Sequence, residues 1–404
     1  MNILAIQVLN KIYGNINKKD KTEVYIKVIL RTDSLKDVCS KILSAVDGSE
    51  LSMVTDTLEL KSFSDGLHLR VTNKEYFVDV KLAVEGIGDF HAAVNANLFL
   101  KLISQITTET IELNIDGNIL VVKGNGTYKL PLAFEGDKIL ELPTIVIDNV
   151  TLETTIAGDS LVSILQHNSK ELLKGNIAKP VQKMYYVDEK GCITFTTGAC
   201  VNSFSVDKPF QILLNSKVVK LFKLFKSGDV AFKLGYDALS DDTIQTKVSF
   251  SNGEIVLTAI LSCDDTLLKQ VPVNAIRGRA DNQYPHSVTV SKDSLIQTLN
   301  RLSLFNAGFG TKEIVKAYSK FEFKSDAVVV WDVRKENNET VMYNNSAYSL
   351  DGDGYTVSLD VNDLKLTLES CSEQYVTLNF GDRKAVVVVR GNIKTVIPEI
   401  ITME

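Results

Sequence analysis

The tripeptide Asp-Ser-Leu occurs three times, and its copies divide the chain into thirds. They stand at Asp33-Ser34-Leu35, Asp159-Ser160-Leu161 and Asp293-Ser294-Leu295 of 404 residues. Each copy follows a strand-like stretch and precedes apolar residues at helical spacing. Asp or Ser at such a point is typical of a helix N-cap, because its side-chain oxygen accepts from an otherwise unpaired backbone N–H. A strand and a capped helix that recur in each third indicate an internal triplication.

A second helix and a hairpin follow in each third. Helical patterns cover Asn95–Ile106, Asn215–Phe225 and Val361–Leu368. The turns after them are Asp116-Gly117-Asn118, Ser251-Asn252-Gly253-Glu254 and Gly381-Asp382-Arg383-Lys384. Asp-Gly and Asn-Gly between alternating apolar residues are strong hairpin signals. The sequence predicts an α+β fold of three tandem copies of a two-helix plus β-sheet domain, at 23–146, 147–274 and 275–404, after an N-terminal extension at 1–22.

Composition excludes several classes of protein. The longest apolar runs have the length of strands, far below the roughly 18 residues of a membrane helix, and the first residues lack the basic start of a signal peptide. The five cysteines are scattered, with no Cys-x-x-Cys pair, which argues against a zinc site and a disulfide framework and favours a reducing, cytoplasmic setting. The net charge of −6 weighs against a protein that coats nucleic acid, but it leaves room for one basic stripe.

The sequence carries no recognisable catalytic motif. It has four histidines, none in His-Glu-x-x-His, and it has no P-loop and no nucleophile elbow. Asp351-Gly352-Asp353-Gly354 lacks the remaining ligands of a calcium loop and predicts a turn. A cryptic enzyme site around His167 and Cys200 is an open alternative, but the prediction is a protein without catalysis, cofactor or metal.

The stretch Asn215–Lys226 is the most basic helical segment. At about 100° per residue, its lysines occupy one half of a helix and its apolar residues the other. Such a face is either solvated or directed at phosphates. Matching helices carry fewer cations. The predicted DNA-facing residues are Lys41, Lys101, Lys170, Lys174, Lys217, Lys220, Lys223, Lys226, Arg301 and Lys365.

In the order of its elements, the chain resembles the bacterial DNA polymerase sliding clamp, the beta subunit of DNA polymerase III. The local stretches that carry the resemblance are Val94–Phe99, Gly126–Leu132, Ile212–Leu224, Leu257–Leu261, Lys269–Pro272 and Thr395–Pro398. The family consists of three copies of one domain, and two chains close head to tail into a ring lined by helices.

The resemblance also implies a pocket for short peptides of polymerases and clamp loaders. By position it maps onto Val181, Thr196, Gly198, Val201, Val396, Ile397 and Pro398. Ala199-Cys200 replaces the usual His-Arg pair, Glu399 replaces an apolar residue, and Asp47-Gly48-Ser49-Glu50 replaces a basic loop. These departures predict an altered pocket and an altered DNA contact.

The ring interface of the resembled family maps onto two places here. They are an edge strand at Tyr128 and Leu130, and a helix end at Leu304 and Phe305. Burial of Leu304 and Phe305 in their own domain is the alternative.

The sequence therefore predicts a homodimeric processivity factor. It would encircle double-stranded DNA without reading its sequence, tether a DNA polymerase, be loaded by a clamp loader and have no membrane contact. The alternative from another class is a structural or assembly protein with three repeated α+β domains and no DNA binding. The divergence makes a phage-encoded clamp, working in a host cell, a further hypothesis.

Overall fold

The computed structural model describes residues 27–46, 52–84, 88–168, 179–196, 198–238, 244–261, 265–306, 318–344 and 354–400. The predicted extension at 1–22 and the Asp47–Glu50 and Asp351–Gly354 loops, except Gly354 itself, lie outside the described residues. The chain divides into two compact units. Unit 1 comprises Met1–Cys39, Thr57–Leu69 and Leu82–Glu141, and unit 2 comprises Ser40–Asp56, Arg70–Lys81 and Leu142–Glu404.

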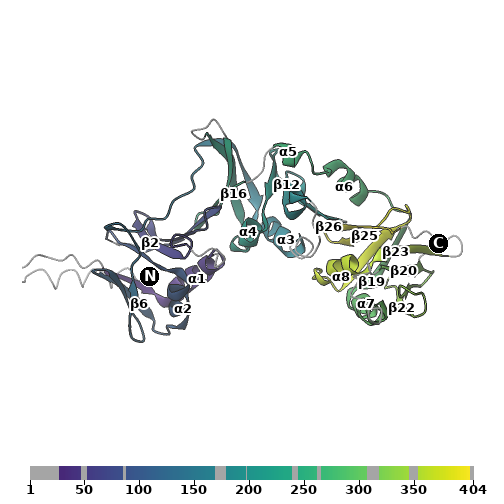
Figure 1. Cartoon of the computed structure of the whole chain (residues 1–404), viewed down its shortest axis with the longest axis horizontal. Helices are drawn as coiled ribbons and strands as arrows, with labels where there is room; N and C mark the ends of the chain where they lie inside the picture. Colours follow the sequence, from purple (N-terminus) through teal and green to yellow (C-terminus); the bar gives the residue numbers. More distant parts are fainter. Residues whose placement is uncertain are drawn as a thin grey trace, which may run out of the picture. The chain divides into compact units, whose positions relative to one another are not determined.

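One order of ten elements runs through the chain three times, when the adjoining helices at Ser216–Val219 and Lys220–Leu224 are counted as one and the 3₁₀ helix at Pro180–Lys183 as an addition. Figure 1 colours the chain in sequence order, from purple at the N-terminus to yellow at the C-terminus. The first third contains β1 (Lys27–Arg31), α1 (Thr32–Leu43), β2 (Thr57–Phe63), β3 (Gly66–Thr72), β4 (Tyr76–Leu82), β5 (His91–Asn95), α2 (Ala96–Gln105), β6 (Thr110–Asp116), β7 (Ile119–Lys123) and β8 (Thr127–Pro131), and then the short β9 (Phe134–Glu135) and β10 (Lys138–Ile139).

The middle third contains β11 (Asn149–Ala157), α3 (Gly158–Asn168), η2 (Pro180–Lys183), β12 (Tyr185–Asp188), β13 (Gly191–Phe195), β14 (Ala199–Ser203), β15 (Gln211–Leu214), α4 (Ser216–Val219), η3 (Lys220–Leu224), β16 (Asp229–Ala238), β17 (Ile244–Ser251) and β18 (Ile255–Ile260). The short helices α5 (Asp265–Leu268) and α6 (Val273–Ala280) follow it. The sequence did not predict either of them.

The last third contains β19 (His286–Ser291), α7 (Lys292–Asn306), β20 (Tyr318–Phe323), β21 (Ala327–Trp331), β22 (Asn338–Met342), β23 (Tyr355–Asp360), α8 (Val361–Glu369), β24 (Tyr375–Phe380), β25 (Ala385–Arg390) and β26 (Ile393–Pro398). The predicted repetition of strand, helix, strands, helix and strands is confirmed. The residue boundaries of the three predicted domains stay a prediction.

The three Asp-Ser-Leu copies begin helices, but they lie inside the first turn. The helices start at Thr32, Gly158 and Lys292, one residue before each Asp. The N-cap positions therefore lie two residues before the Asp and three before the Ser of each copy, so the prediction of these residues as N-caps is wrong. At α7 the backbone N–H of Ser294 donates to the hydroxyl of Ser291 at 3.3 Å, so the residue before the helix satisfies it.

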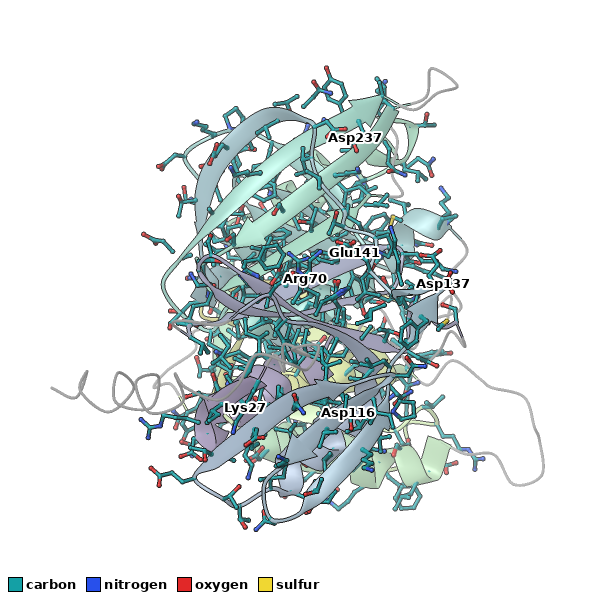
Figure 2. All side chains as sticks on the ribbon, turned by 90° about the vertical axis from the view of Figure 1, so that its left-hand side faces the viewer. Lys27, Arg70, Asp116, Asp137, Glu141 and Asp237 are labelled. Carbon is teal, nitrogen blue, oxygen red and sulfur yellow. The ribbon has the colours of Figure 1, made fainter. Side chains whose placement is uncertain are left out.

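Unit 1 contains the antiparallel sheet β1-β6-β7-β8. Glu112 on β6 accepts from Lys27 and Lys123, which lie on the strands to either side, at 2.7 and 2.9 Å. These two ammonium groups lower the pKa of Glu112. Figure 2 labels Lys27 on this sheet and Asp116 at the end of β6. Opposite charges on adjacent strands help to hold the register of the sheet.

Unit 2 contains two joints at which strands from different thirds pair. In one, β18 pairs with β4 of the first third. On its other side β18 pairs with β17, which pairs with β16, and β16 pairs with β11. In the other, β14 of the middle third pairs with β26 of the last third in the sheet β15-β12-β13-β14-β26-β25-β24-β19. A separate sheet, β22-β21-β20-β23, completes the last third.

Two apolar clusters in unit 2 position the candidate site. The larger lies within the last third, where α7 and α8 pack against each other and their buried residues, such as Leu299 and Leu364, meet those of the two sheets. The smaller includes Ile193, Val201, Ile276, Val387 and Val396, so it joins the middle third, α6 and the last third. Burial of these side chains fixes β14 beside β26.

An ion pair ties the segment that precedes the middle third to the sheet of that third. Lys247 on β17 contacts Asp237, which Figure 2 labels near the end of β16, and also donates to the backbone carbonyl of Val146 at 2.8 Å. Hydrogen bonding to Lys247 lowers the pKa of Asp237.

Four cysteines in the described ranges, Cys39, Cys192, Cys200 and Cys371, are buried free thiols. Among the described helices, none has both the length and the apolar character needed to cross a membrane.

Candidate functional site

A cavity of about 520 Å³ opens where β14, β26 and α6 meet. Pairing of Ala199 with Val396 forms its base, and α6 packs against both strands. Its apolar lining residues are Phe195, Ala199, Pro272, Ala275, Ile276, Ala385, Val396 and Pro398. Such a lining favours apolar side chains as occupants.

Three cations stand on the rim of this cavity: Arg279 on α6, and Arg383 and Lys384 in the β24–β25 turn. All three are exposed. Asp382 shapes the turn, since its side chain accepts from the backbone N–H groups of Lys384 and Ala385 at 2.9 and 3.1 Å. Within the described part of the chain, no carboxylate lies within 4 Å of these three cations.

Glu399 adds a carboxyl group to the same rim. Its backbone N–H donates to the carbonyl of Lys384 at 2.9 Å, and its Oε2 is buried without a hydrogen bond among the described residues. Burial raises the pKa of Glu399, nearby Asp382 raises it further, and Arg383 opposes the shift. The position that the resemblance marked as altered therefore lies in the cavity wall.

The structure brings most of the predicted pocket residues together. Thr196, Gly198, Val396 and Pro398 line the cavity. Ile397 lines a smaller hollow that shares Thr196, Gly198 and Val396 with it. Val181 and Val201 are buried in the cluster beneath and do not line the cavity. Their placement gives these two residues a packing role at this site.

Gly198 is required by close packing. A Cβ added here would lie 2.6 Å from the carbonyl oxygen of Val396, closer than real Cβ atoms approach backbone oxygen. The absence of a side chain allows β14 and β26 to approach and leaves the cavity open.

Arg390 is buried next to the pairing of β14 with β26 and stabilises it by hydrogen bonds. Its side chain is 2 % exposed and donates to the carbonyl of Thr367 and the hydroxyls of Ser370 and Thr395, at 3.2, 2.6 and 2.7 Å. It also contacts the Cys200 sulfur at 3.7 Å. One guanidinium thus links α8, β26 and β14. Buried polar networks of this kind specify one arrangement of their elements.

Several lining residues were not predicted from sequence: Phe195, Pro272, Ile276, Arg279, Arg383 and Lys384. The sequence does contain a partial signal for the helix that carries some of them. Pro272 precedes a short segment in which Ile276 and Ala280 are buried four residues apart, a spacing typical of a helix. Arg383 and Lys384 lie in a turn that was predicted as a hairpin turn only.

The basic segment is not one regular α-helix, so its predicted geometry is wrong. It consists of α4 (Ser216–Val219) followed by the 3₁₀ helix η3 (Lys220–Leu224). From Val218 to Lys226 two buried apolar residues alternate with one exposed lysine. This period of three matches the three residues per turn of a 3₁₀ helix, whose positions i and i+3 are in line. This period of three is present in the sequence, and the α-helical angle of about 100° per residue does not describe it.

Lys220 and Lys223 therefore form a row, with exposed Lys226 following them in the sequence. Among described residues no carboxylate lies within 4 Å of these three lysines. Beneath them, Phe222 and Phe250 form an edge-to-face pair at 5.0 Å. Lys217 lies apart from the row, because it is half-buried and 3.6 Å from Glu75.

The other predicted DNA-facing residues differ among themselves. Lys41, Arg301 and Lys365 lie near Glu254, Glu339 and Glu369, at 3.6, 2.5 and 3.9 Å. Lys101 is exposed on α2. Lys170 and Lys174 lie outside the described residues. Arg301 lowers the pKa of Glu339 on β22, so its charge is engaged within the last third.

The predicted interface residues lie on β8 and α7. Tyr128 is half-buried, while Leu130 is buried within its own unit. Leu304 and Phe305 are 75 % and 49 % exposed, so the alternative that they complete their own core is wrong. α7 packs against the edge strand β22, which carries Met342, another exposed apolar residue.

The proposed enzyme site around Cys200 gains no support from the geometry. The Cys200 side chain is fully buried beside Arg390 and Thr395, so a substrate has no path to its sulfur. The side chain of His167 lies outside the described residues.

Comparisons with known proteins bear on this arrangement. No family model and no curated protein matches the sequence. Among solved structures, the DNA polymerase sliding clamp of Bacillus subtilis has a TM-score of 0.71 at 13% identity, covering 94% of this chain and 100% of that chain. The Pseudomonas aeruginosa sliding clamp bound to griselimycin gives 0.72 at 13% identity, covering 94% and 100%. The Helicobacter pylori beta clamp bound to a DNA ligase peptide gives 0.67 at 14%, covering 93% and 100%.

The predicted resemblance and fold class are thereby confirmed at the level of structure. The ten-element order repeated three times and the match over nearly all of both chains agree. This chain has the fold of the bacterial DNA sliding clamps, the beta subunits of DNA polymerase III.

Proposed function

We propose that the protein is a DNA polymerase processivity factor: two copies form a ring around duplex DNA, and the ring tethers a polymerase through the cavity at β14 and β26. The observation that carries this proposal is the sliding-clamp fold over 94% of the chain. The factor needs no reaction of its own. A tether works by keeping the polymerase at high effective concentration near the primer end.

The strand pairing supports ring closure. The two joints are built alike. β18, the last strand of the middle third, pairs with β4 of the first third, and β26, the last strand of the chain, pairs with β14 of the middle third. β4 and β14 are equivalent, because each is strand number three after the first helix of its repeat. By element order, β8 and β22 are the corresponding strands, and each lies at the edge of its sheet without such a partner among the described strands. Pairing of β8 with β22 of a second copy would repeat the same joint and would cover two exposed sheet edges.

Oligomeric state tests this part of the proposal. We expect the wild-type chain to be a dimer by analytical ultracentrifugation, and a closed ring by single-particle imaging. Leu304→Asp with Phe305→Asp should produce a folded monomer. As a control, Ile244→Asp introduces the same type of change at an exposed apolar residue of β17, away from α7, and should leave the dimer intact. A wild-type monomer at every concentration, with or without DNA, contradicts a self-closing ring.

The lysine row supports a DNA-facing surface, because cations that contact phosphates give sequence-independent and mobile binding. Replacing Lys217, Lys220 and Lys223 with Glu should abolish clamp-dependent processivity while the dimer survives. Retention on circular DNA, and its loss after the DNA is linearised, tests encirclement directly. Unchanged retention in the triple variant would remove these lysines from the DNA surface. A dimer that never distinguishes circular from linear DNA would favour a structural protein without DNA binding.

The cavity supports the tethering role. The H. pylori clamp binds a DNA ligase peptide and the P. aeruginosa clamp binds griselimycin, as their structures are described. We propose that the cavity around Val396 receives a short segment of a polymerase or clamp loader. Photo-crosslinking from Ala275, which lines the cavity, to a replication protein that enhances DNA synthesis only with this chain would support the role. If such a replication protein crosslinks only from positions outside the cavity and never from Ala275, the tethering role of the cavity is refuted.

A further inference from the structure

We infer that the cavity at β14, β26 and α6 selects an acidic linear peptide, whose apolar side chains enter the cavity while flanking carboxylates meet Arg279, Arg383 and Lys384. This inference rests on the proposed tethering role and names the chemistry of the partner segment. It goes beyond the fold, because Ala199 and Glu399, two positions at which this chain departs from the resembled family, line this cavity.

The first argument is a contrast between two arginines of one helix. Arg277 on α6 makes two hydrogen bonds to Asp188, at 2.6 and 2.7 Å, and this contact raises the pKa of Arg277. Arg279, two residues later, is exposed on the cavity rim. The fold thus uses one arginine to hold α6 and leaves the charge of the next one available.

The second argument is that the rim cations come from separate elements and meet at one place. Arg279 is provided by α6, whereas Arg383 and Lys384 are provided by the β24–β25 turn. Arg383 has a φ of 55°, and its N–H donates to the hydroxyl of Tyr355 at 3.0 Å. The turn is therefore held in a conformation uncommon for an arginine, with both cations beside an apolar cavity.

The third argument concerns charge balance. Glu399 is the carboxylate that lines the same rim. Its Oε2 is buried without a hydrogen bond among the described residues, and burial raises its pKa, so three cations of the rim face this one carboxyl group. Asp382 is committed to the backbone of its own turn. The rim therefore presents more positive than negative charge.

A peptide fits this arrangement better than single-stranded nucleic acid. The cavity is lined by aliphatic residues and one phenylalanine, Phe195, whereas nucleic-acid grooves offer aromatic faces for successive bases. Apolar side chains bring the binding energy of burial, and the exposed cations supply orientation and choice of partner.

An array of eight-residue peptides tests the inference. Two central positions vary through Leu, Ile, Met and Phe, and the flanking positions are all Glu, all Gln or all Lys. The full chain is applied, and the best peptides are measured by fluorescence anisotropy. We expect the Glu series to bind at least about tenfold more tightly than the Lys series with the same centre, with a smaller difference at high salt.

Charge-reversal variants make the test specific. Arg279→Glu with Lys384→Glu should remove or invert the preference, and Arg383→Glu alone should weaken it. Lys324→Glu makes the same charge change as Arg383→Glu, but in the exposed β20–β21 turn, and should leave the preference unchanged. Glu399→Gln should bind the Glu series about equally or more tightly, because it removes a titratable acid from the rim.

Three results overturn the inference: no member of the array binds, the Lys series binds as well as the Glu series, or an oligothymidylate displaces the peptides with equal affinity. Retention on circular DNA is measured separately. If the chain is retained on circular DNA but shows no preference for the Glu series, only this inference is wrong. If it prefers the Glu series but is not retained on circular DNA, the inference about the cavity holds and the proposal of a clamp is wrong.

Discussion

The cavity at β14 and β26 and the lysine row of η3 are built in opposite ways. Lys220 and Lys223 are neighbours on one short helix, and their exposure follows from a local period of three. The cavity combines segments near 196, 276 and 396 that meet only through β14–β26 pairing and the packing of α6. We therefore expect changes at the joint to alter folding and binding together, and changes in the lysine row to alter binding alone.

The largest effect is expected for Arg390→Ala. This change removes a buried side chain, leaves a cavity and deprives Thr367, Ser370 and Thr395 of a donor. We expect a loss of about 4 kcal/mol in the free energy of unfolding, measured by denaturant titration with circular dichroism. The matched change Arg334→Ala, at an exposed arginine, should cost less than about 0.5 kcal/mol. Equal losses would show that the network does not stabilise the joint.

Arg277→Ala should come next, because it leaves the buried carboxylate of Asp188 without its bidentate partner. We expect a loss of about 3 kcal/mol. Arg279→Ala on the same helix should change the free energy of unfolding by less than about 0.5 kcal/mol while weakening binding of acidic peptides. A similar loss of stability from both variants would erase the distinction between a structural arginine and a binding arginine.

Gly198→Ala should cost about 2 kcal/mol, because the new Cβ would meet the carbonyl oxygen of Val396 at 2.6 Å. The strained joint should also bind peptide less well. Gly278→Ala is a close control: it lies within α6 and its added Cβ meets no atom within 4 Å. It should be neutral or slightly stabilising, since alanine favours helix over glycine. Thermal unfolding of the two variants separates these outcomes.

Glu399→Gln should have a smaller, pH-dependent effect, under about 1 kcal/mol. Since folding raises the pKa of Glu399, its protonation stabilises the folded state. That contribution is fully present below the unfolded pKa of about 4.5 and is lost as pH rises through the folded pKa. The variant should therefore gain on the wild type as pH rises from 4 to 7. A difference independent of pH would exclude this titration as the cause.

Lys220→Glu with Lys223→Glu should have the smallest effect on folding, below about 0.5 kcal/mol. On DNA it should lower affinity and reduce the slope of log affinity against log salt by about 2. Lys324→Glu should leave that slope unchanged. If the double variant unfolds readily, the lysine row has a structural role that its exposure does not reveal.

Much of the fold was predictable because its signals are local. Asp33, Asp159 and Asp293 each mark the first turn of a helix, and the Asn252-Gly253 turn lies between β17 and β18 as expected. The misinterpreted segment at Lys220–Leu224 also carried its signal locally, in a period of three that fits a 3₁₀ helix. In these places hydrogen bonds join residues close in sequence, so composition and spacing suffice.

The cavity was only partly predictable. Four of its residues, including Gly198 and Val396, were placed by resemblance, whereas Arg279, Arg383 and Lys384 were missed. Nothing near Arg279 in the sequence distinguishes it from Arg277, because the distinction is made by Asp188, on a strand of another segment.

The sequence by itself therefore determined the three repeats, their helices and hairpins, and the exposed lysines, since each depends on periodicity within one segment. Only the tertiary structure decided that β14 meets β26, that Arg390 is buried between them, and that three cations surround one apolar cavity. Those features depend on burial and hydrogen bonds between residues far apart in the chain, and no single segment records which distant partner will satisfy its polar groups.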